Sequence, residues 1–212
     1  MTGLSLPPNP WGDRHRRRVG LLGGSFNPAH QGHLHISQQA LYRLKLDEVW
    51  WLVSPQNPLK PIAGMAPQAQ RVAVARRVAA HPRIRVTDIE TRLGTRYTAD
   101  TLRALTRRFS QTCFVWLMGA DNLQQIAQWD RWTSIFACVP VAVFDRSPYS
   151  YKALSSKAAR RMSWARLSGR KAFGMADHAP PAWVFLHTRR HPASATAIRQ
   201  GCATAASVSG KA

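Results

Sequence analysis

The chain has 212 residues, of which 45% are hydrophobic and 19% charged. This length and composition suit one folded domain with a sizeable core and exclude an intrinsically disordered protein. The 30 Lys and Arg residues against 10 Asp and Glu give a formal net charge of +20, which attracts phosphate-rich molecules. Because the arginines are spread over most of the chain, we favour a small polyanionic substrate over specific nucleic-acid binding.

The sequence also argues against a membrane protein and a disulfide-rich protein. No apolar run approaches the roughly 20 residues of a membrane-spanning helix, and the basic cluster 14–18 precedes too short an apolar run for a signal peptide. The cysteines Cys113, Cys138 and Cys202 are far apart and form no C-x-x-C pair, so neither a disulfide framework nor a zinc site is predicted. We therefore expect a soluble cytoplasmic protein without membrane contact and without a protein-bound metal.

Three segments divide the chain. Residues 1–17 are rich in proline and basic side chains and predict a flexible lead-in without a fold of its own. Residues 18–200 carry the apolar pattern of the folded domain. Residues 201–212 are rich in Ala and Ser and predict a weakly ordered tail.

The first predicted strand covers residues 19–22 and runs into a glycine-rich turn. Gly23 and Gly24 permit a tight turn and close backbone approach, and a helix begins near Gly32. The start of such a helix offers unpaired backbone N–H groups to an anion. This stretch therefore predicts a phosphate-binding turn.

Two histidines follow the turn. His30 and His33 are three residues apart, so both rings would lie on one face and could donate hydrogen bonds to phosphoryl oxygens. The alternative is a structural one, in which one histidine caps the helix and the other lies on the surface. A histidine pair alone does not decide between them.

A βαβ unit is predicted next. Leu34, Ala40, Leu41 and Leu44 have helical spacing, and the apolar run 48–53 predicts a second buried strand. A proline-rich loop at 54–61 follows that strand, where doubly wound sheets place ligand-contacting groups, although it could also be a plain connector.

The second unit contains another helix and strand. Pro67 suits the N1 position of a helix that extends to about residue 80, with Val72, Ala75 and Ala79 facing inward. The alternating residues 84–87 predict a short strand.

A helix is then predicted with Thr98 as its N-cap and Asp100 in its first turn. It is followed by an apolar strand at 112–118, which ends at Gly119 and Asp121. An acidic side chain just beyond the carboxyl end of a parallel strand is on the ligand side of such a sheet. Asp130 is a candidate N-cap for a short helix.

Two more strands are predicted, at 139–144 and 183–187. Pro140 marks either the beginning of the first of these strands or an edge position in the sheet. The basic segment 150–171 predicts a solvated basic helix, with a nucleic-acid patch as the alternative. Residues 194–199 combine hydroxyls suited to a helix start with an arginine one turn later. Six strands alternating with helices predict a single-domain, doubly wound α/β fold with a mostly parallel sheet, and phosphate ligands at the carboxyl ends of the strands.

Several of these stretches resemble one known family. Gly24-Ser-Phe-Asn-Pro-Ala-His-Gln-Gly-His33 is similar to the G-[ST]-F-x-P-x-H-x-G-H signature of the nucleotidyltransferase superfamily. Further motifs over residues 18–200 resemble the bacterial nicotinate-nucleotide adenylyltransferases: Pro55-Gln-Asn-Pro-Leu-Lys60, Arg96-Tyr-Thr98, Gly119-Ala-Asp-Asn-Leu123, Gln128-Trp-Asp-Arg-Trp132 and Ser194-Ala-Thr-Ala-Ile-Arg199. The resemblance implies a Rossmann-like fold and adenylyl transfer from ATP to nicotinate mononucleotide in NAD biosynthesis.

The resemblance also implies roles for individual residues. His30, His33 and Arg199 would act on the triphosphate, and Mg²⁺ would be carried with ATP. ATP would be bound by Gly23, Gly24, Ser25, Phe26, Gly32, Gly119, Asp121, Ser194 and Thr196. Nicotinate mononucleotide would be bound by Tyr97, Thr98, Trp129 and Lys60, with Trp129 stacked on the pyridine ring. An aromatic face suits a flat ring, and a helix start favours an anionic carboxylate over an amide.

This sequence departs from the family pattern at two places. Asn27 stands where many relatives carry Asp, which bears on how the turn is braced. The C-terminus is short and rich in small residues, so its packing and the contacts of a homo-oligomer are left open. The remaining alternatives are a transferase of the same superfamily acting on another acceptor, such as phosphopantetheine or a polyol phosphate, and a basic nucleic-acid-binding protein with a vestigial site.

Overall fold

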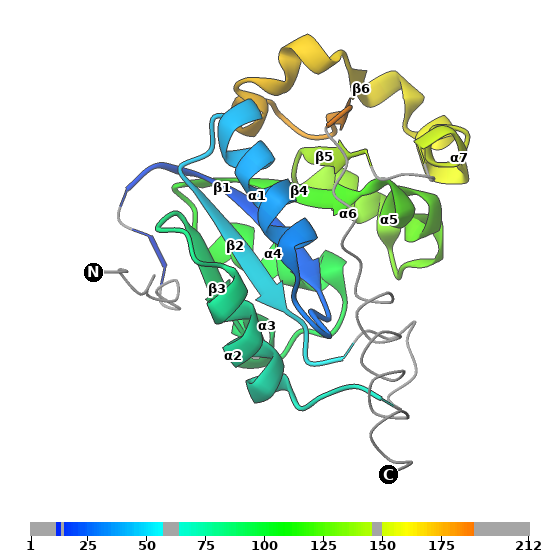
Figure 1. Cartoon of the computed structure of the whole chain (residues 1–212). Helices are drawn as coiled ribbons and strands as arrows, with labels where there is room; N and C mark the ends of the chain where they lie inside the picture. Colours follow the sequence, from blue (N-terminus) through cyan, green and yellow to red (C-terminus); the bar gives the residue numbers. More distant parts are fainter. Residues whose placement is uncertain (1–11, 14, 57–63, 146–149, 189–212) are drawn as a thin grey trace, which may run out of the picture.

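The computed structural model describes residues 12–13, 15–56, 64–145 and 150–188, and shows one parallel sheet with helices on both faces (Figure 1). All pairings between neighbouring strands in it are parallel, and the strand order is β3-β2-β1-β4-β5-β7-β6. The strands are β1 (Arg17–Gly24), β2 (Glu48–Val53), β3 (Ile84–Thr87), β4 (Thr112–Gly119), β5 (Val141–Phe144), β6 (Arg166–Leu167) and β7 (Trp183–Leu186).

The helices connect these strands and include several short 3-10 turns, labelled η. In chain order they are α1 (Gln31–Arg43), α2 (Gln68–Val78), α3 (Ile89–Leu93), α4 (Thr98–Arg108), α5 (Ala120–Gln125), η1 (Ile126–Gln128), α6 (Trp132–Cys138), α7 (Ser150–Leu154), α8 (Lys157–Arg161), η2 (Ser163–Ala165), η3 (Gly169–Ala172) and η4 (Met175–Asp177). Among the described residues, no helix is both long enough and apolar enough to cross a bilayer.

Side chains alternate between two cores, one on each face of the sheet. In β4, Phe114, Trp116 and Met118 join the core that includes residues of α3 to α8. Val115 and Leu117 point to the opposite face and join the core that includes residues of α1, α2, η3 and η4. A strand buried on both faces carries an uninterrupted apolar run, which is why the strand patterns of β1, β2, β4, β5 and β7 could be recognised in the sequence. The doubly wound fold is confirmed.

The strand order places a topological switch point between β1 and β4. The chain goes from β1 to β2 and β3 on one side, and then returns to place β4 on the other side of β1. Leu22 of β1 pairs with Leu117 of β4, and two residues further along the two strands are Gly24 and Gly119. Ligands of open α/β sheets bind outside the carboxyl ends of strands at such a point.

Two predicted helix caps are wrong. Thr98 is the first residue of α4, and the extended Tyr97 takes the N-cap position without a side-chain capping bond. The carbonyl of Tyr97 instead accepts hydrogen bonds from the N–H groups of Asp100 and Thr101, both at 3.0 Å. At α6 the cap position belongs to Arg131, whose φ is 46°, and the Asp130 carboxylate accepts a hydrogen bond from the Arg131 side chain. The helix predicted at Pro67 begins one residue later, with Pro67 at the N-cap.

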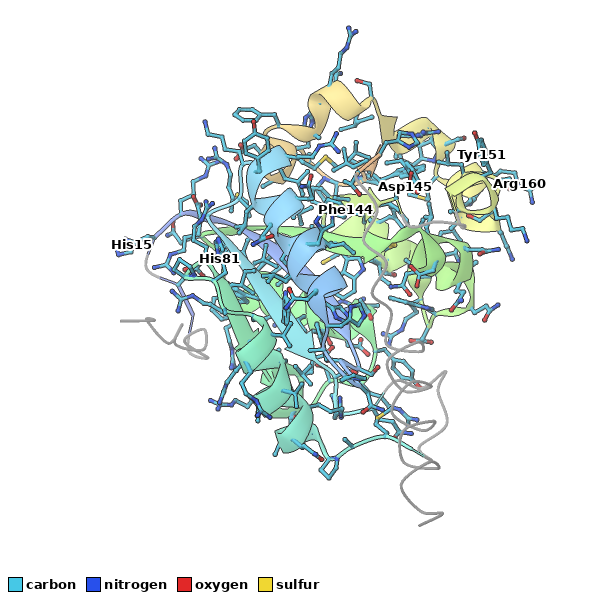
Figure 2. The ribbon with its side chains drawn as sticks, in the orientation of Figure 1. His15, His81, Phe144, Asp145, Tyr151 and Arg160 are labelled. Atoms are coloured by element: carbon cyan, nitrogen blue, oxygen red, sulfur yellow. The ribbon has the colours of Figure 1, made fainter. Side chains whose placement is uncertain are left out.

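The basic segment 150–171 does not form the single helix that its sequence predicts. The Ser155 hydroxyl donates to the Tyr151 carbonyl at 3.1 Å, and the Ser156 hydroxyl accepts the N–H of Ala159 at 3.3 Å. Ser156 is thus the N-cap of α8, and its side chain satisfies a backbone N–H group at the start of a new helix. The Ser155 hydroxyl adds a second donor to the Tyr151 carbonyl, which also accepts the Ser155 N–H at 3.1 Å. Figure 2 shows Tyr151 and Arg160 projecting outward from this segment, and both are exposed.

The segment also contains a strand that the sequence did not reveal. Arg166 and Leu167 form β6 and pair with Trp183 and Val184 of β7. The sheet thus has a seventh strand beyond the six predicted. Two residues are too few to show the alternation by which a strand is recognised in a sequence.

Candidate active site

The turn after β1 is closed by the two histidines themselves. The Nδ1 atom of His30 accepts the backbone N–H of Gly32 at 3.1 Å, and the Nδ1 atom of His33 accepts the backbone N–H of His30 at 3.1 Å. The two rings lie 3.9 Å apart between centroids. His30 is thus the N-cap of α1, and His33, three residues later, completes a reciprocal capping box. The predicted proximity of the two rings is confirmed.

This capping fixes which ring nitrogen carries the proton. A nitrogen that accepts an N–H cannot itself be protonated, so the donor position of each imidazole is Nε2. The expectation that the helix start offers unpaired N–H groups needs correction, because those of Gly32 and His33 are engaged within the turn. The donors that the two rings could offer an anion are therefore their Nε2–H groups.

The His33 ring is supported from β2. Phe26 is 2% exposed and packs against both His33 and Trp51, with ring-centroid distances of 4.7 and 5.1 Å, while His33 and Trp51 are themselves 5.8 Å apart. The indole N–H of Trp51 donates to the Ser37 hydroxyl at 2.7 Å, and this hydroxyl donates to the His33 carbonyl at 2.9 Å. Phe26 has a φ of 47°, in the left-handed region that non-glycine residues adopt infrequently. Because its ring is buried, Phe26 could contact ATP only through its backbone.

A buried arginine joins this turn to the loop after β2. Arg71 of α2 is 2% exposed, and its guanidinium donates to the Ser25 carbonyl at 2.6 Å and to the Ser54 carbonyl at 2.8 Å. It also donates to the carbonyls of Pro55 at 2.9 Å and Ala66 at 2.8 Å. Burial lowers the pKa of Arg71 from its ordinary value. One side chain thus holds three backbone segments together.

Asn27 braces the same loop from the other side. Its amide donates to the Gly64 carbonyl at 3.0 Å, and its amide oxygen accepts the N–H of Ala66 at 3.3 Å. The bond to the Gly64 carbonyl requires a side-chain donor, and the bond from the Ala66 N–H requires a side-chain acceptor. An amide provides both, whereas a carboxylate provides only acceptors. The departure from the family pattern at this position therefore has a structural role. Neither Arg71 nor Asn27 could be assigned this role from the sequence, because their partners are backbone groups of other segments.

The end of β4 supplies the opposite side of the switch point. Gly119 ends the strand, and Asp121, half-buried, lies in the first turn of α5. Because β1 and β4 are neighbours, Asp121 follows the strand beside the one that leads to the histidines. The structure thus places the two predicted parts of the ATP site on adjacent strand ends.

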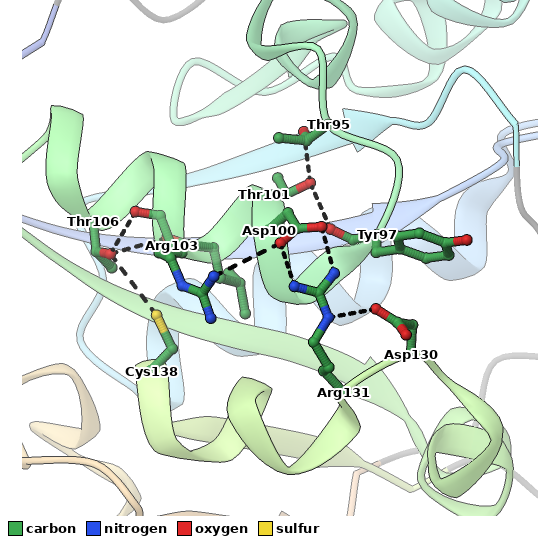
Figure 3. A network of polar contacts seen from close by, with 10 residues as sticks. Thr95, Tyr97, Asp100, Thr101, Arg103, Thr106, Asp130, Arg131 and Cys138 are labelled. Atoms are coloured by element: carbon green, nitrogen blue, oxygen red, sulfur yellow. Dashed lines mark hydrogen bonds and ion pairs between the residues drawn. The ribbon is translucent and has the colours of Figure 1, made fainter.

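The predicted acceptor residues lie on α4 and on the segment before α6. Tyr97 and Thr98 form the start of α4, and Trp129, half-buried, packs against the core on the same face of the sheet. The two segments are joined by a bidentate ion pair, in which Arg131 Nη1 and Nη2 donate to the Asp100 carboxylate at 2.8 and 2.6 Å (Figure 3). Arg131 also donates to Asp130 at 2.6 Å. The structure therefore connects the two segments that the sequence assigned to the acceptor.

Four predicted site residues lie outside the described residues, and their roles stay predictions: Lys60, Ser194, Thr196 and Arg199. Within the part of the chain that the structure describes, no three His, Cys, Asp or Glu side chains gather in a group that could hold a metal ion. The side chains closing the turn are hydrogen-bond donors, which suit phosphate oxygens better than a cation.

Comparison with known proteins gives the family. A family model described as cytidylyltransferase-like matches residues 21–201. A protein of Bradyrhizobium sp. (strain ORS 278), named a probable nicotinate-nucleotide adenylyltransferase, is 53% identical over 182 residues, which are 86% of this chain and 95% of that protein. A protein of the same name from Cereibacter sphaeroides (strain ATCC 17025 / ATH 2.4.3) is 55% identical over 181 residues, 85% of this chain and 96% of that protein. The chain belongs to the nicotinate-nucleotide adenylyltransferase family.

The structural comparison agrees with this family at the level of the fold. The structure of Plasmodium falciparum nicotinic acid mononucleotide adenylyltransferase complexed with NaAD matches with a TM-score of 0.66 and 15% identity, over 87% of this chain and 83% of that one. A second structure of that enzyme, complexed with APC, matches with a TM-score of 0.61 and 14% identity over the same shares. The sequence resemblance to the adenylyltransferase family and the predicted Rossmann-like fold are both confirmed.

Proposed function

We propose that this protein transfers the adenylyl group of ATP to nicotinate mononucleotide, giving nicotinate adenine dinucleotide and pyrophosphate. The observation that carries the proposal is the histidine pair after β1, whose Nε2 donor positions are set by capping bonds at both Nδ1 atoms. Membership of the adenylyltransferase family supports the same reaction. Within the residues that the structure describes, no observation favours another acceptor or a nucleic acid.

The reaction needs no covalent enzyme intermediate. A phosphate oxygen of the mononucleotide attacks the α-phosphorus of ATP, a new P–O bond forms, and the bond to the bridging oxygen of the β-phosphate breaks in line with it. Charge builds on the phosphoryl oxygens as this happens, and the Nε2–H groups of His30 and His33 would donate to them. We propose that Mg²⁺ enters as part of Mg-ATP, neutralising the phosphates, and that Arg199, Ser194 and Thr196 meet the same nucleotide.

The acceptor would lie between α4 and Trp129. Stacking on the Trp129 indole suits the flat pyridine ring of the mononucleotide, and the start of α4 suits its negative carboxylate. Because Thr98 does not cap α4 through its side chain, we assign the carboxylate contact to the backbone N–H groups at this helix start. We propose the same acceptor role for Tyr97 and Lys60. The proposal also places this ATP-dependent reaction in the cytoplasm.

The test is a panel of phosphorylated acceptors with Mg-ATP, followed by pyrophosphate release. We expect nicotinate mononucleotide to be preferred over nicotinamide mononucleotide by about ten- to a hundredfold in kcat/KM, because the amide lacks the charge that the helix start stabilises. Trp129→Ala should weaken both acceptors alike. Release with phosphopantetheine and not with nicotinate mononucleotide would overturn the acceptor assignment, and absence of release with every acceptor would overturn the reaction.

A further inference from the structure

A buried carboxyl group lies beneath the proposed acceptor site. Glu90 belongs to α3, which packs against α4 and β2, and only 8% of the residue is exposed. It carries no role in the reaction described above. Acidic side chains are seldom buried without an ion pair, and removing such a group from water costs several kcal/mol when it is charged.

Glu90 is connected to the start of α4 by hydroxyl groups. The Thr101 hydroxyl donates to Glu90 Oε1 at 3.1 Å and lies 3.2 Å from the Tyr97 carbonyl. It also lies 2.9 Å from the Thr95 hydroxyl, and the Thr95 N–H donates to the backbone carbonyl of Glu90 at 3.0 Å. Figure 3 shows Thr95 and Thr101 side by side next to Tyr97. The carboxyl group of Glu90 is therefore linked through the Thr101 hydroxyl to Tyr97, the N-cap residue of α4.

The surrounding charged groups do not neutralise it. On α4, Asp100 is paired with Arg131 and Arg103. On β2, Glu48 is paired with Arg17 and Arg85. At the start of α3, Asp88 in the N-cap position pairs with Arg92. The basic Arg107 and Arg108 are exposed at the far end of α4. Among the described residues, Glu90 Oε2 is buried and has no hydrogen-bond partner.

We propose that Glu90 is a positioning residue that sets the preference between a carboxylate and an amide on the acceptor ring. When it is protonated, the hydroxyl network holds the turn before α4 without adding charge, and the helix start attracts the carboxylate of nicotinate mononucleotide. When it is ionised, a negative charge lies behind the helix start and opposes that carboxylate, while a neutral amide is unaffected. This inference rests on the proposed function.

The protonation equilibrium of Glu90 falls in the range where such a switch can be measured. Burial raises the pKa of Glu90 to about 7, and the hydrogen bond from Thr101 opposes the rise. Below that pH the group is neutral in the folded protein, and above it the group becomes charged. The folded state alone carries the raised pKa, so the stability of the protein should fall as pH rises from the usual range of a glutamate toward 7.

The experiment measures the ratio of kcat/KM for nicotinate mononucleotide to kcat/KM for its amide analogue between pH 6 and 8.5. Both acceptors share their phosphate, ribose and ATP partner, so titrations of these groups cancel in the ratio. We expect the ratio to fall by about three- to tenfold through pH 7 in the unmodified protein, as for a charge acting over several ångströms inside a protein. The Glu90→Gln side chain keeps the shape of the glutamate and cannot ionise. In this variant the ratio should therefore stay constant across the pH range, at the value that the unmodified protein shows below pH 7.

Glu48→Gln is the matched control, because Glu48 lies at the start of β2 and should leave the pH profile of the ratio unchanged. A pH-independent ratio in the unmodified protein overturns the inference without requiring any variant to fold. So does a Glu90→Gln profile that still falls through pH 7. Absence of turnover with both acceptors would instead contradict the proposed function, which keeps the two failures distinct. Calorimetry of nicotinate mononucleotide at pH 6 and pH 8 supplies a readout without catalysis, and a drop in affinity is expected only where Glu90 is present.

Discussion

Gly23 in β1 lies directly against the indole ring of Trp116 in the neighbouring strand β4. A Cβ atom at position 23 would overlap Cη2 of this ring and would lie 3.1 Å from Cζ2. At Gly24, the next residue, the nearest atom to an added Cβ is Cε2 of Phe26 at 3.6 Å, which is an ordinary contact. The two glycines of the motif therefore differ in role, because the first is required by packing within the sheet.

Gly23→Ala should destabilise the protein by about 1–3 kcal/mol through overpacking of the core, measured by denaturant unfolding. Trp116→Leu in the same chain should recover part of this loss by making room for the methyl group. Gly24→Ala is the matched variant, and its stability should remain close to that of the unmodified protein. If Gly24 lies against the ATP phosphates, this second variant should lose activity while staying folded. Equal stability losses at both positions would contradict this assignment.

The histidine at position 33 can be tested with two substitutions that separate its nitrogens. Asparagine places an amide near Nδ1 and can keep the capping bond from the His30 N–H, whereas glutamine can place an amide N–H near Nε2. We expect His33→Asn to remain stable and to lose about a hundredfold or more in kcat with little change in ATP binding, because a donor to the transition state is lost.

Compared with His33→Asn, His33→Gln should be less stable and should lose less kcat. A variant His33→Asn with nearly normal turnover and a raised KM for ATP would show that the ring serves binding only. His35→Ala on the same helix is the control for nonspecific effects of removing an imidazole from α1, because His35 lies outside the motif.

Arg71 should prove essential to the architecture of the ligand-side loops. Arg71→Met removes four hydrogen bonds and leaves their backbone carbonyls without this donor, so we expect a loss of about 2–4 kcal/mol in the free energy of unfolding. Arg71→Lys keeps the positive charge but cannot reproduce the several N–H donors of the guanidinium. Its free energy of unfolding should therefore lie between those of the unmodified protein and Arg71→Met. If lysine were fully equivalent to arginine here, the geometric explanation would be wrong and the positive charge alone would matter.

The Asp100–Arg131 pair should act on the acceptor and not on ATP. Asp100→Asn and Arg131→Ala should each raise the KM for nicotinate mononucleotide several-fold, because the pair joins the start of α4 to the segment that carries Trp129. The double variant should be little worse than either single variant, since both remove one interaction. Additive effects would show that the two residues act separately.

The pH dependence of this pair follows from its ionisation. The hydrogen bonds from Arg131 hold the pKa of Asp100 below its usual value, so the carboxylate is charged throughout the neutral range. Its contribution is therefore complete above the ordinary pKa of an aspartate and is lost only as pH falls through the lowered value. The KM effect of Asp100→Asn should consequently be the same at pH 6 and pH 8, unlike that of Glu90→Gln.

The sequence by itself determined the doubly wound fold, the bounds of β2 and β3, and the position of the histidine motif. These features depend on local patterns: strands buried on both faces are continuously apolar, and a turn of small residues followed by two histidines is recognisable without knowing its neighbours. The resemblance to the adenylyltransferase family used the same local motifs and was confirmed by the comparisons.

Only the tertiary structure decided what surrounds and holds the motif. Arg71 and Asn27 bond to backbone groups of other segments, and Gly23 is constrained by a ring from a neighbouring strand. The cap expected at Thr98 was wrong because Tyr97 adopts an extended conformation at the start of α4, which residue preferences alone do not specify. The protonation state of Glu90 could not be predicted from the sequence either. Whether a glutamate is charged on a surface or neutral in a core depends on which segments fold over it. Interactions between segments distant in the chain leave no periodic signal in the sequence, so these contacts and environments are determined only when the chain folds.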